Sequence, residues 1–328
     1  MRILAGQPIA QKLLEKNLQE SKPFHAYLFE GPEGTGKLNA AIHFSCILNG
    51  LRSLTEDCSY DEMVRIKEGS NPDIRVIQSD GASVKIEQMR EMIRDIQIRP
   101  FQRRWKIFII QDADRMSLPA ANSVLKVMEE PPPQGIIILT TAYPAQILPT
   151  IRSRCQIVPF RAMATAAIEE EIISNYSLDV ETAHLIAGMS EGLPAKAAEM
   201  AESPMFEDFR RQVIEEIERV RTGTNKDIVS LIRDYERDKN TEEKLRMWST
   251  IIRDILVWRL TNDVELLYHR DKLPYYESIR DVDTYHAVES LVKLEKATLH
   301  LQRNVNSGLA LRAALGRINK VFKGGSHG

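Results

Sequence analysis

A glycine-rich loop near the amino terminus has the residue types that bind phosphate. It reads Gly31-Pro32-Glu33-Gly34-Thr35-Gly36-Lys37-Leu38 and follows the apolar run 27–30. Glycines at these positions let backbone N–H groups turn inward around a phosphate, and the lysine ammonium at the start of a helix can reach the β- and γ-phosphates. We therefore predict a nucleotide-binding loop, referred to below as the phosphate loop, that includes Gly31, Pro32, Gly34, Thr35, Gly36, Lys37 and Leu38.

The residues that should hold Mg²⁺ beside this loop are altered. Leu38 stands where such loops carry Ser or Thr, whose hydroxyl ligates the metal, and leucine has no side-chain oxygen. The acidic element after the apolar run 107–110 reads Gln111-Asp112, and one alignment puts Gln111 at the metal-binding Asp and Asp112 at the acid that activates water. A one-residue shift makes Asp112 the metal ligand instead.

From these changes we expect a degenerate site. It can hold ATP or ADP without strong Mg²⁺ binding, and it hydrolyses little or no ATP. The alternative is slow turnover with Mg²⁺ held through water by Asp112, because protein-bound Mg²⁺ keeps several waters.

Alternating apolar and amphipathic segments predict the elements that position the loop. The apolar runs have the continuous character of parallel strands covered on both faces. Between them, apolar residues recur every three or four positions, which predicts helices. The predicted strands are residues 27–30, 74–77, 106–110, 136–140 and 156–160. From about residue 164 only helical segments follow, so the fold class is α/β plus all-α.

Three domains are predicted from this change of pattern. Residues 1–162 form the nucleotide-binding-like α/β domain, 163–205 a small helical domain, and 206–328 a larger helical domain that ends in a flexible tail. A coiled coil is the alternative for the last part, but its apolar residues keep no heptad over several repeats.

Composition limits the remaining possibilities. The 328 residues carry 44 Lys and Arg against 46 Asp and Glu, a net charge of −2, so any contact with DNA requires a local basic patch. The longest apolar runs are far below the ~20 residues of a membrane helix, and we expect no membrane contact. Three cysteines are too few for a disulfide framework. Because the amino terminus also lacks the apolar core of a secretory signal, we expect a cytoplasmic protein.

Four segments together resemble one known family. They are residues 25–32, 120–132, 147–155 and 304–311, and the most specific are Leu125-Lys126-x-x-Glu129-Glu130-Pro131-Pro132 and Ser153-Arg154-Cys155. The chain is similar to AAA+ clamp-loader proteins, specifically the delta-prime subunits of bacterial DNA polymerase III, from about Gly6 to Leu311. The resemblance implies an AAA+ P-loop parallel sheet with flanking helices, a small helical lid over 163–205 and a carboxyl-terminal helical collar for oligomerisation over 206–328.

The resemblance also implies a function for Arg154. In this family an arginine between Ser153 and Cys155 reaches in trans to the γ-phosphate on the adjacent subunit of a ring, where a rigid, always charged guanidinium can stabilise the transition state. The alternative is a surface arginine paired with a nearby acid. The implied partners are tau/gamma-type and delta-type subunits and, indirectly, the sliding clamp and primer–template DNA.

Such a subunit helps to load the clamp onto primed DNA. It requires no cofactor and no intrinsic ATPase, yet it is a component of the DNA polymerase III holoenzyme, a DNA-directed DNA polymerase and hence a nucleotidyltransferase complex. The alternative functions are an active tau/gamma-type motor ATPase and a stand-alone AAA+ DNA-repair protein. Leu38 and the missing cysteines described next favour the first function.

Departures from the family pattern concern metal and nucleotide sensing. Many relatives carry four zinc-binding cysteines before the turn at 71–73. Here only Cys58 remains in that segment, and Cys46 and Cys58 cannot complete a tetrahedral site, so we predict no zinc and no other metal. Ala142 aligns near the residue that senses the γ-phosphate, and Lys196 lies where active relatives have a second sensing arginine.

A basic stretch over residues 90–106 is a candidate DNA contact. Arg99, Arg103 and Arg104 could bind phosphates, with Phe101 or Trp105 against a sugar or base. The alternative is a solvated helix face followed by a loop, with Trp105 in the core.

Overall fold

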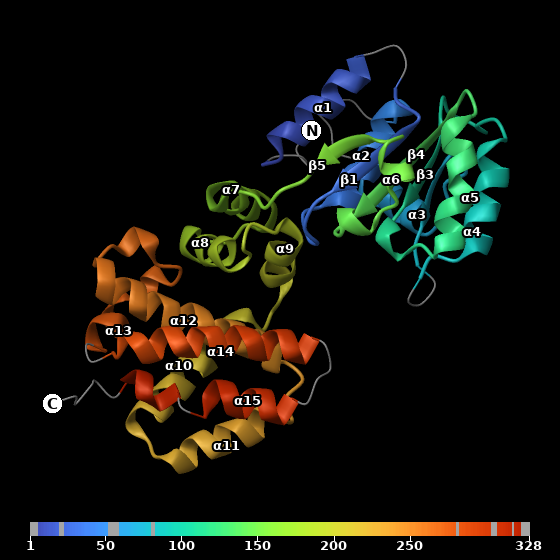
Figure 1. Ribbon diagram of the computed structural model, residues 1–328. Coiled ribbons are helices and arrows are strands. Elements are labelled where there is room, and N and C mark those ends of the chain that lie inside the picture. Colours follow the sequence, from blue (N-terminus) through green and yellow to red (C-terminus); the bar gives the residue numbers. More distant parts are fainter. Residues whose placement is uncertain are drawn as a thin grey trace. The chain divides into compact units, whose positions relative to one another are not determined.

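The computed structural model describes residues 6–19, 23–51, 59–79, 83–279, 282–302, 307–316 and 318–322. The chain divides into two compact units, which are described separately (Figure 1). Unit 1 comprises Met1–Ile168 and Ser190–Lys196, and unit 2 comprises Glu169–Met189 and Ala197–Gly328. The segment 163–205 is therefore shared between the units, and the division into three domains stays a prediction.

Unit 1 is built on a parallel sheet of five strands in the order β2-β3-β4-β1-β5. All five predicted strands are confirmed, with ends shifted by at most one residue. Their bounds are β1 Ala26–Glu30, β2 Ile74–Ile77, β3 Lys106–Ile110, β4 Gly135–Thr141 and β5 Gln156–Pro159.

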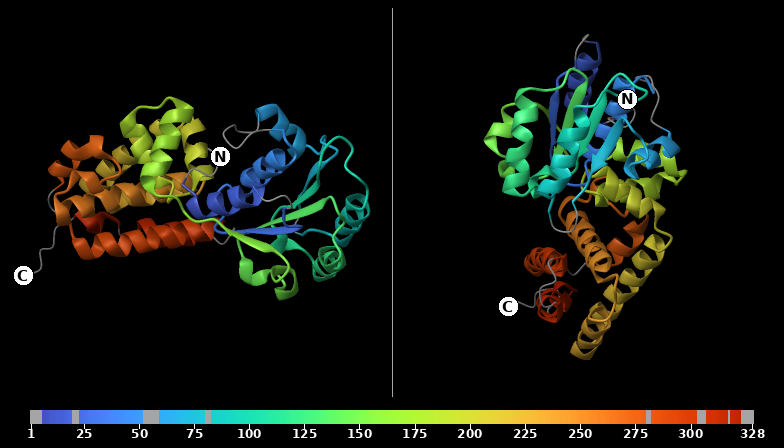
Figure 2. Two further views of the ribbon diagram at one scale, coloured as in Figure 1. Left: turned by 90° about the horizontal axis from the view of Figure 1, so that it is seen from above. Right: turned by 90° about the vertical axis from the view of Figure 1, so that its right-hand side faces the viewer.

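Helices cover both faces of this sheet, which explains the continuous apolar runs. Successive strand residues face opposite sides: Ile107 and Ile109 pack with one set of helices, and Phe108 and Ile110 with the other. The first set is α1 Pro8–Gln19, α2 Lys37–Leu48 and α3 Tyr60–Lys67. The second set, on the other face of the sheet, is α4 Ile86–Ile96, α5 Leu118–Glu129 and α6 Pro149–Arg152. The left view of Figure 2 shows blue helices and green helices on opposite sides of the strands.

Local sequence sets the limits of α5, which carries part of the site. Its start is capped by Ser117, whose side-chain oxygen accepts a bond from the N–H of Ala120, and proline occupies an early helical position. The helix ends at Glu129, before the three prolines at 131–133. Since proline cannot continue a helix, the segment then turns into β4.

In the described part of unit 2 every regular element is a helix. Here α14 packs against α12 and α15 around buried residues such as Trp248 and Leu294, as packed helices rather than a coiled coil. None of the helices described is long and apolar enough to cross a membrane. The helices that lie in or enter unit 2 are α7 Thr165–Tyr176, α8 Val180–Met189, α9 Pro194–Glu202, α10 Phe206–Thr222, α11 Asn225–Tyr235, α12 Thr241–Thr261, α13 Leu273–Ser278, α14 Thr284–Gln302 and α15 Ser307–Leu315.

Candidate functional site

The phosphate loop lies at the carboxyl end of β1, where the sequence places it. β1 ends at Glu30, and α2 begins at Lys37. Gly34 and Gly36 have φ angles of 79° and 82°, in the left-handed region that glycine adopts without a steric cost. The loop therefore has the strand–loop–helix geometry that a phosphate site requires.

The polar groups of the phosphate loop are bonded within the chain. The Lys37 ammonium donates to the carbonyl oxygens of Gly31 at 2.7 Å and Pro32 at 2.6 Å, and the Thr35 hydroxyl donates to Pro32 at 2.8 Å. The N–H of Ala195, at the start of α9, donates to the Gly34 carbonyl at 3.1 Å. Two of the three N–H donors of the Lys37 ammonium are therefore used within its own loop, and a phosphate competes with the two carbonyl oxygens for this group.

Burial also disfavours the charge on Lys37. Its side chain is almost fully buried, and this desolvation lowers the pKa of the ammonium, although Asp112 and Asp114 at the end of β3 act in the opposite direction. Asp112 of the predicted acidic element therefore lies near the lysine, and so does Asp114, which the sequence did not single out.

The residues around Lys37 are a poor match for Mg²⁺. Leu38 packs against the hydrophobic core under α1 and α2. Gln111 is the first residue after β3, and its buried Oε1 has no hydrogen-bond partner; Asp112 follows with a φ of 50° and donates its N–H to the Thr140 hydroxyl. Leu38 offers no side-chain oxygen, and Gln111 offers a neutral amide in place of a carboxylate, so the donor set is weak for a cation that prefers oxygen ligands in an octahedron.

The two predicted sensor positions are also changed or paired. Ala142 has no polar side-chain atom, while the preceding Thr141 donates its hydroxyl to Asp114 at 2.5 Å. Lys196 lies one residue after the contact of α9 with the phosphate loop, but its ammonium donates to Glu191 at 2.7 Å. Neither position offers a free cation to a nucleotide.

Metal-binding side chains do not gather elsewhere in the described part of the chain. Among the residues that the structure describes, no three His, Cys, Asp or Glu side chains form a group that could hold a metal. Cys46 is buried in the core of unit 1, and Cys58 lies outside the described residues. The absence of zinc thus stays a prediction.

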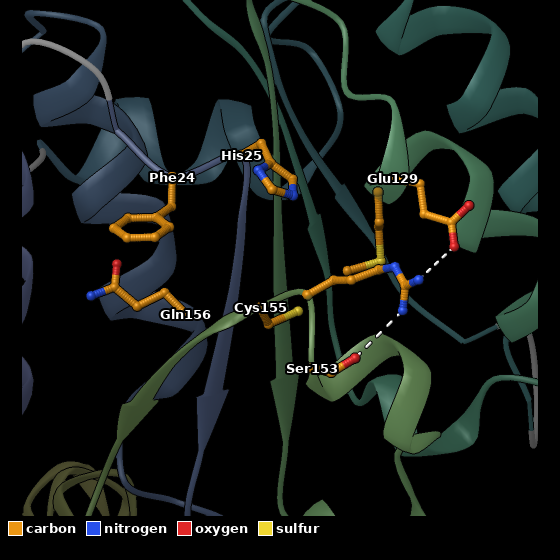
Figure 3. Close-up of a pocket in the computed structure, with 8 residues that line it drawn as sticks. Phe24, His25, Glu129, Ser153, Cys155 and Gln156 are labelled. Carbon is orange, nitrogen blue, oxygen red and sulfur yellow. Dashed lines mark hydrogen bonds and ion pairs between the residues drawn. The ribbon is translucent and has the colours of Figure 1, made fainter.

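Arg154 lies at the opposite edge of the same sheet, in an open hollow of about 500 Å³ (Figure 3). This Arg154 hollow is formed by residues that precede β1, end α5 or lead into β5. Because all five strands are parallel, these residues gather at the amino edge, whereas the phosphate loop lies at the carboxyl edge. The lining residues are Phe24, His25, Met128, Glu129, Ser153, Arg154, Cys155 and Gln156.

Three groups hold the Arg154 guanidinium at this edge. Nη1 donates to the carbonyl of Thr150 at 2.8 Å and to the Ser153 hydroxyl at 3.4 Å, and Nη2 donates to Oε1 of Glu129 at 2.6 Å (Figure 3). The side chains of Arg154 and Glu129 are 33% and 52% exposed. Arg154 is therefore paired with a nearby acid, the alternative that the sequence allowed. Both side chains remain accessible to a further partner.

Two residues near Arg154 in this segment, Cys155 and Arg152, have structural roles. Burial raises the pKa of the Cys155 thiol to about 12, so it is a neutral group rather than a reactive thiolate. Arg152 donates two hydrogen bonds to Glu30, at 2.6 and 3.1 Å, and so ties α6 to β1. Sequence reasoning missed Arg152, and it quoted Glu129 only as part of a motif.

The candidate DNA-binding residues lie in the loop between α4 and β3. Arg99, Arg103 and Arg104 are exposed, and Phe101 is 76% exposed. Trp105 is buried, and its N–H donates to Asn49, so this residue belongs to the core, as the alternative predicted. DNA contact by the arginines stays a prediction.

Known proteins resemble this chain along most of its length. A family model described as "DNA polymerase III, delta subunit" matches residues 6–164. The chain is 31% identical over 321 residues to DNA polymerase III subunit delta' of Bacillus subtilis (strain 168), and the match covers 94% of each protein. It is 35% identical over 197 residues to DNA polymerase III subunit tau of the same organism, which covers 58% of this chain and 35% of that protein.

Proposed function

The chain belongs to the delta-prime family of DNA polymerase III subunits, and from this premise we propose that it supplies Arg154 in trans to a nucleotide on a neighbouring clamp-loader subunit. In this role it helps to load the sliding clamp onto primed DNA. Its own ATP hydrolysis is small or absent.

The observation that carries the proposal is the position of Arg154. The phosphate loop follows Glu30, the last residue of β1. The Arg154 hollow includes Phe24 and His25, the two residues that precede β1. Five residues of a strand span roughly 16 Å at about 3.3 Å per residue. That distance is beyond the reach of an arginine side chain, so Arg154 can act only on a nucleotide that another chain brings to the hollow.

The phosphate loop supports the second half of the proposal. Leu38 replaces a metal-binding hydroxyl and packs into the core, and Gln111 directly follows β3. Lys37 is bonded to the carbonyls of its own loop. ATP or ADP could bind here after Lys37 is released, without strong Mg²⁺ binding. The same changes disfavour a tau/gamma-type motor.

The proposed partners are tau/gamma-type and delta-type subunits in a cytoplasmic hetero-oligomer. Unit 2 offers a surface that suits assembly: Tyr285, Val288, Val292 and Leu299 recur on one side of α14 and are between 44% and 74% exposed. Apolar side chains exposed in a row of this kind favour protein association. Contact with the sliding clamp and with primer–template DNA would follow from the assembly.

Reconstitution with the other subunits tests the proposal. Arg154→Ala should enter the complex normally in gel filtration but slow single-turnover hydrolysis at the neighbouring site roughly 1000-fold, the low end for an arginine finger. Arg154→Lys should restore little of this rate, because a point charge cannot replace the guanidinium fork. An unchanged rate with Arg154→Ala in an intact complex would contradict the trans role.

A further inference from the structure

We propose that Glu129 is an exchangeable counter-ion for Arg154: it holds the guanidinium while no neighbouring nucleotide is present, and the terminal phosphate of that nucleotide displaces it. This inference rests on the trans role of Arg154 proposed above. It gives Glu129 a function that opposes binding, so removing its charge should strengthen the contact between subunits.

The geometry shows how completely Arg154 is occupied. An arginine has five N–H donors, and the bonds to Thr150, Ser153 and Glu129 use three of them. Of these partners only the Glu129 carboxylate carries a charge. It ends α5, so it adds to the partial negative charge of the helix carboxyl terminus. Figure 3 shows Glu129 and Ser153 as the two ends of the bonds drawn to the guanidinium.

Exposure makes the Glu129 bond exchangeable. More than half of the Glu129 side chain and a third of Arg154 are open to solvent, and ion pairs in such surroundings contribute little to stability. A terminal phosphate carries more negative charge than a carboxylate and accepts two parallel bonds from a guanidinium. It can therefore replace Glu129 at Nη2, while the bond from Nη1 to the Thr150 carbonyl keeps the side chain in place.

The second arginine of this segment shows what a permanent pair looks like. Arg152 makes two bonds to Glu30, whose side chain is only 18% exposed. Arg154 makes a single bond to a carboxylate at the rim of an open hollow. A phosphate and the Glu129 carboxylate repel each other and compete for the N–H donors of Nη2, so on this proposal Glu129 loses its bond when the nucleotide arrives.

The test compares Glu129→Gln with Glu130→Gln, a matched control at the next, exposed residue. Each variant is combined with the tau/gamma-type and delta-type subunits, and its affinity for them is measured by titration with ATPγS and, separately, without nucleotide. Glu129→Gln should bind two- to fivefold more tightly with ATPγS only, a change that corresponds to the range for an exposed ion pair. Glu130→Gln should bind as the wild type does.

The double variant Glu129→Gln/Arg154→Ala separates this inference from the proposed function. The gain from Glu129→Gln should disappear when Arg154 is absent. If Arg154→Ala weakens ATPγS-dependent binding but Glu129→Gln leaves it unchanged or also weakens it, Glu129 is only a structural support, and the inference fails while the trans role survives. If Arg154→Ala has no effect in any of these titrations, the trans role itself fails, and the inference fails with it.

Discussion

The two edges of the unit 1 sheet differ in how their cations are used. At the carboxyl edge, Lys37 is buried and bonded to two carbonyls of its own loop. At the amino edge, Arg154 is a third exposed and has one charged partner at the rim of an open hollow. One edge has a buried cation bonded to its own loop, and the other has a partly exposed cation beside an open hollow.

On the function proposed above, this chain has lost one activity of a nucleotide-binding fold and kept another. Hydrolysis needs a metal, a water-activating acid and a free lysine at the carboxyl edge. A finger in trans needs only a rigid sheet that carries an arginine at the opposite edge. Because the strands connect both edges, the proposed finger needs the intact sheet even if this chain hydrolyses no ATP.

The largest expected effect concerns the Cys155 thiol beside Arg154. With a pKa of about 12, its thiolate fraction at pH 8 should be roughly 1000-fold below that of an ordinary cysteine. Iodoacetamide labelling of the native chain, followed for each cysteine by mass spectrometry, should be slowed by about this factor. The labelling rate should rise tenfold for each pH unit. Rapid labelling at pH 7 would mean that the hollow holds a thiolate as a second anion.

Leu38→Thr tests how far the carboxyl edge is from activity. The variant restores the missing hydroxyl, but it removes apolar contacts with the core and should lower the free energy of unfolding by about 1–2 kcal/mol. ATP hydrolysis by the isolated chain should not increase, because Gln111 and the bonded Lys37 remain. Turnover at about 1 s⁻¹, the low end of ordinary enzymes, would mean that Leu38 alone keeps the phosphate loop from hydrolysing ATP.

Arg152→Ala and Arg154→Ala separate a structural arginine from a functional one. Loss of the two bonds to Glu30 should cost about 1 kcal/mol in urea unfolding, a value reduced because Arg152 is 37% exposed. Arg154→Ala should change the free energy of unfolding by less than ~0.5 kcal/mol. The reverse order of the two costs would mean that Arg154 supports the fold.

Much of this arrangement could be predicted from the sequence. Apolar runs located all five strands, and the parallel direction of the strands follows from their alternation with helices. The spacing of glycines located the phosphate loop, and the Ser-Arg-Cys segment singled out Arg154, whose role stays a prediction. Burial of Trp105 agreed with the alternative predicted for the basic stretch. These features are local, so neighbouring residues determine them.

The contacts that decide how the sites work were not predictable. Arg154 and Glu129 are 25 residues apart, and Arg152 and Glu30 are 122 residues apart. No periodicity in the sequence relates residues at such distances, because the packing of helices on the sheet brings them together. The hydrogen bonds from Lys37 to the carbonyls of Gly31 and Pro32 depend on the side-chain rotamer of the lysine. The loop pattern does not determine this rotamer.

Hydrolysis in the assembly should depend on the amino edge of this chain and not on its own phosphate loop. The most direct measurement is the steady-state ATPase rate of reconstituted clamp loaders that contain Arg154→Ala or Lys37→Ala in this subunit alone, with gel filtration to confirm equal assembly. We predict that Arg154→Ala lowers the rate strongly and that Lys37→Ala changes it less than about twofold, because the hydrolysed ATP is bound by neighbouring chains. A large loss with Lys37→Ala and none with Arg154→Ala would contradict the account.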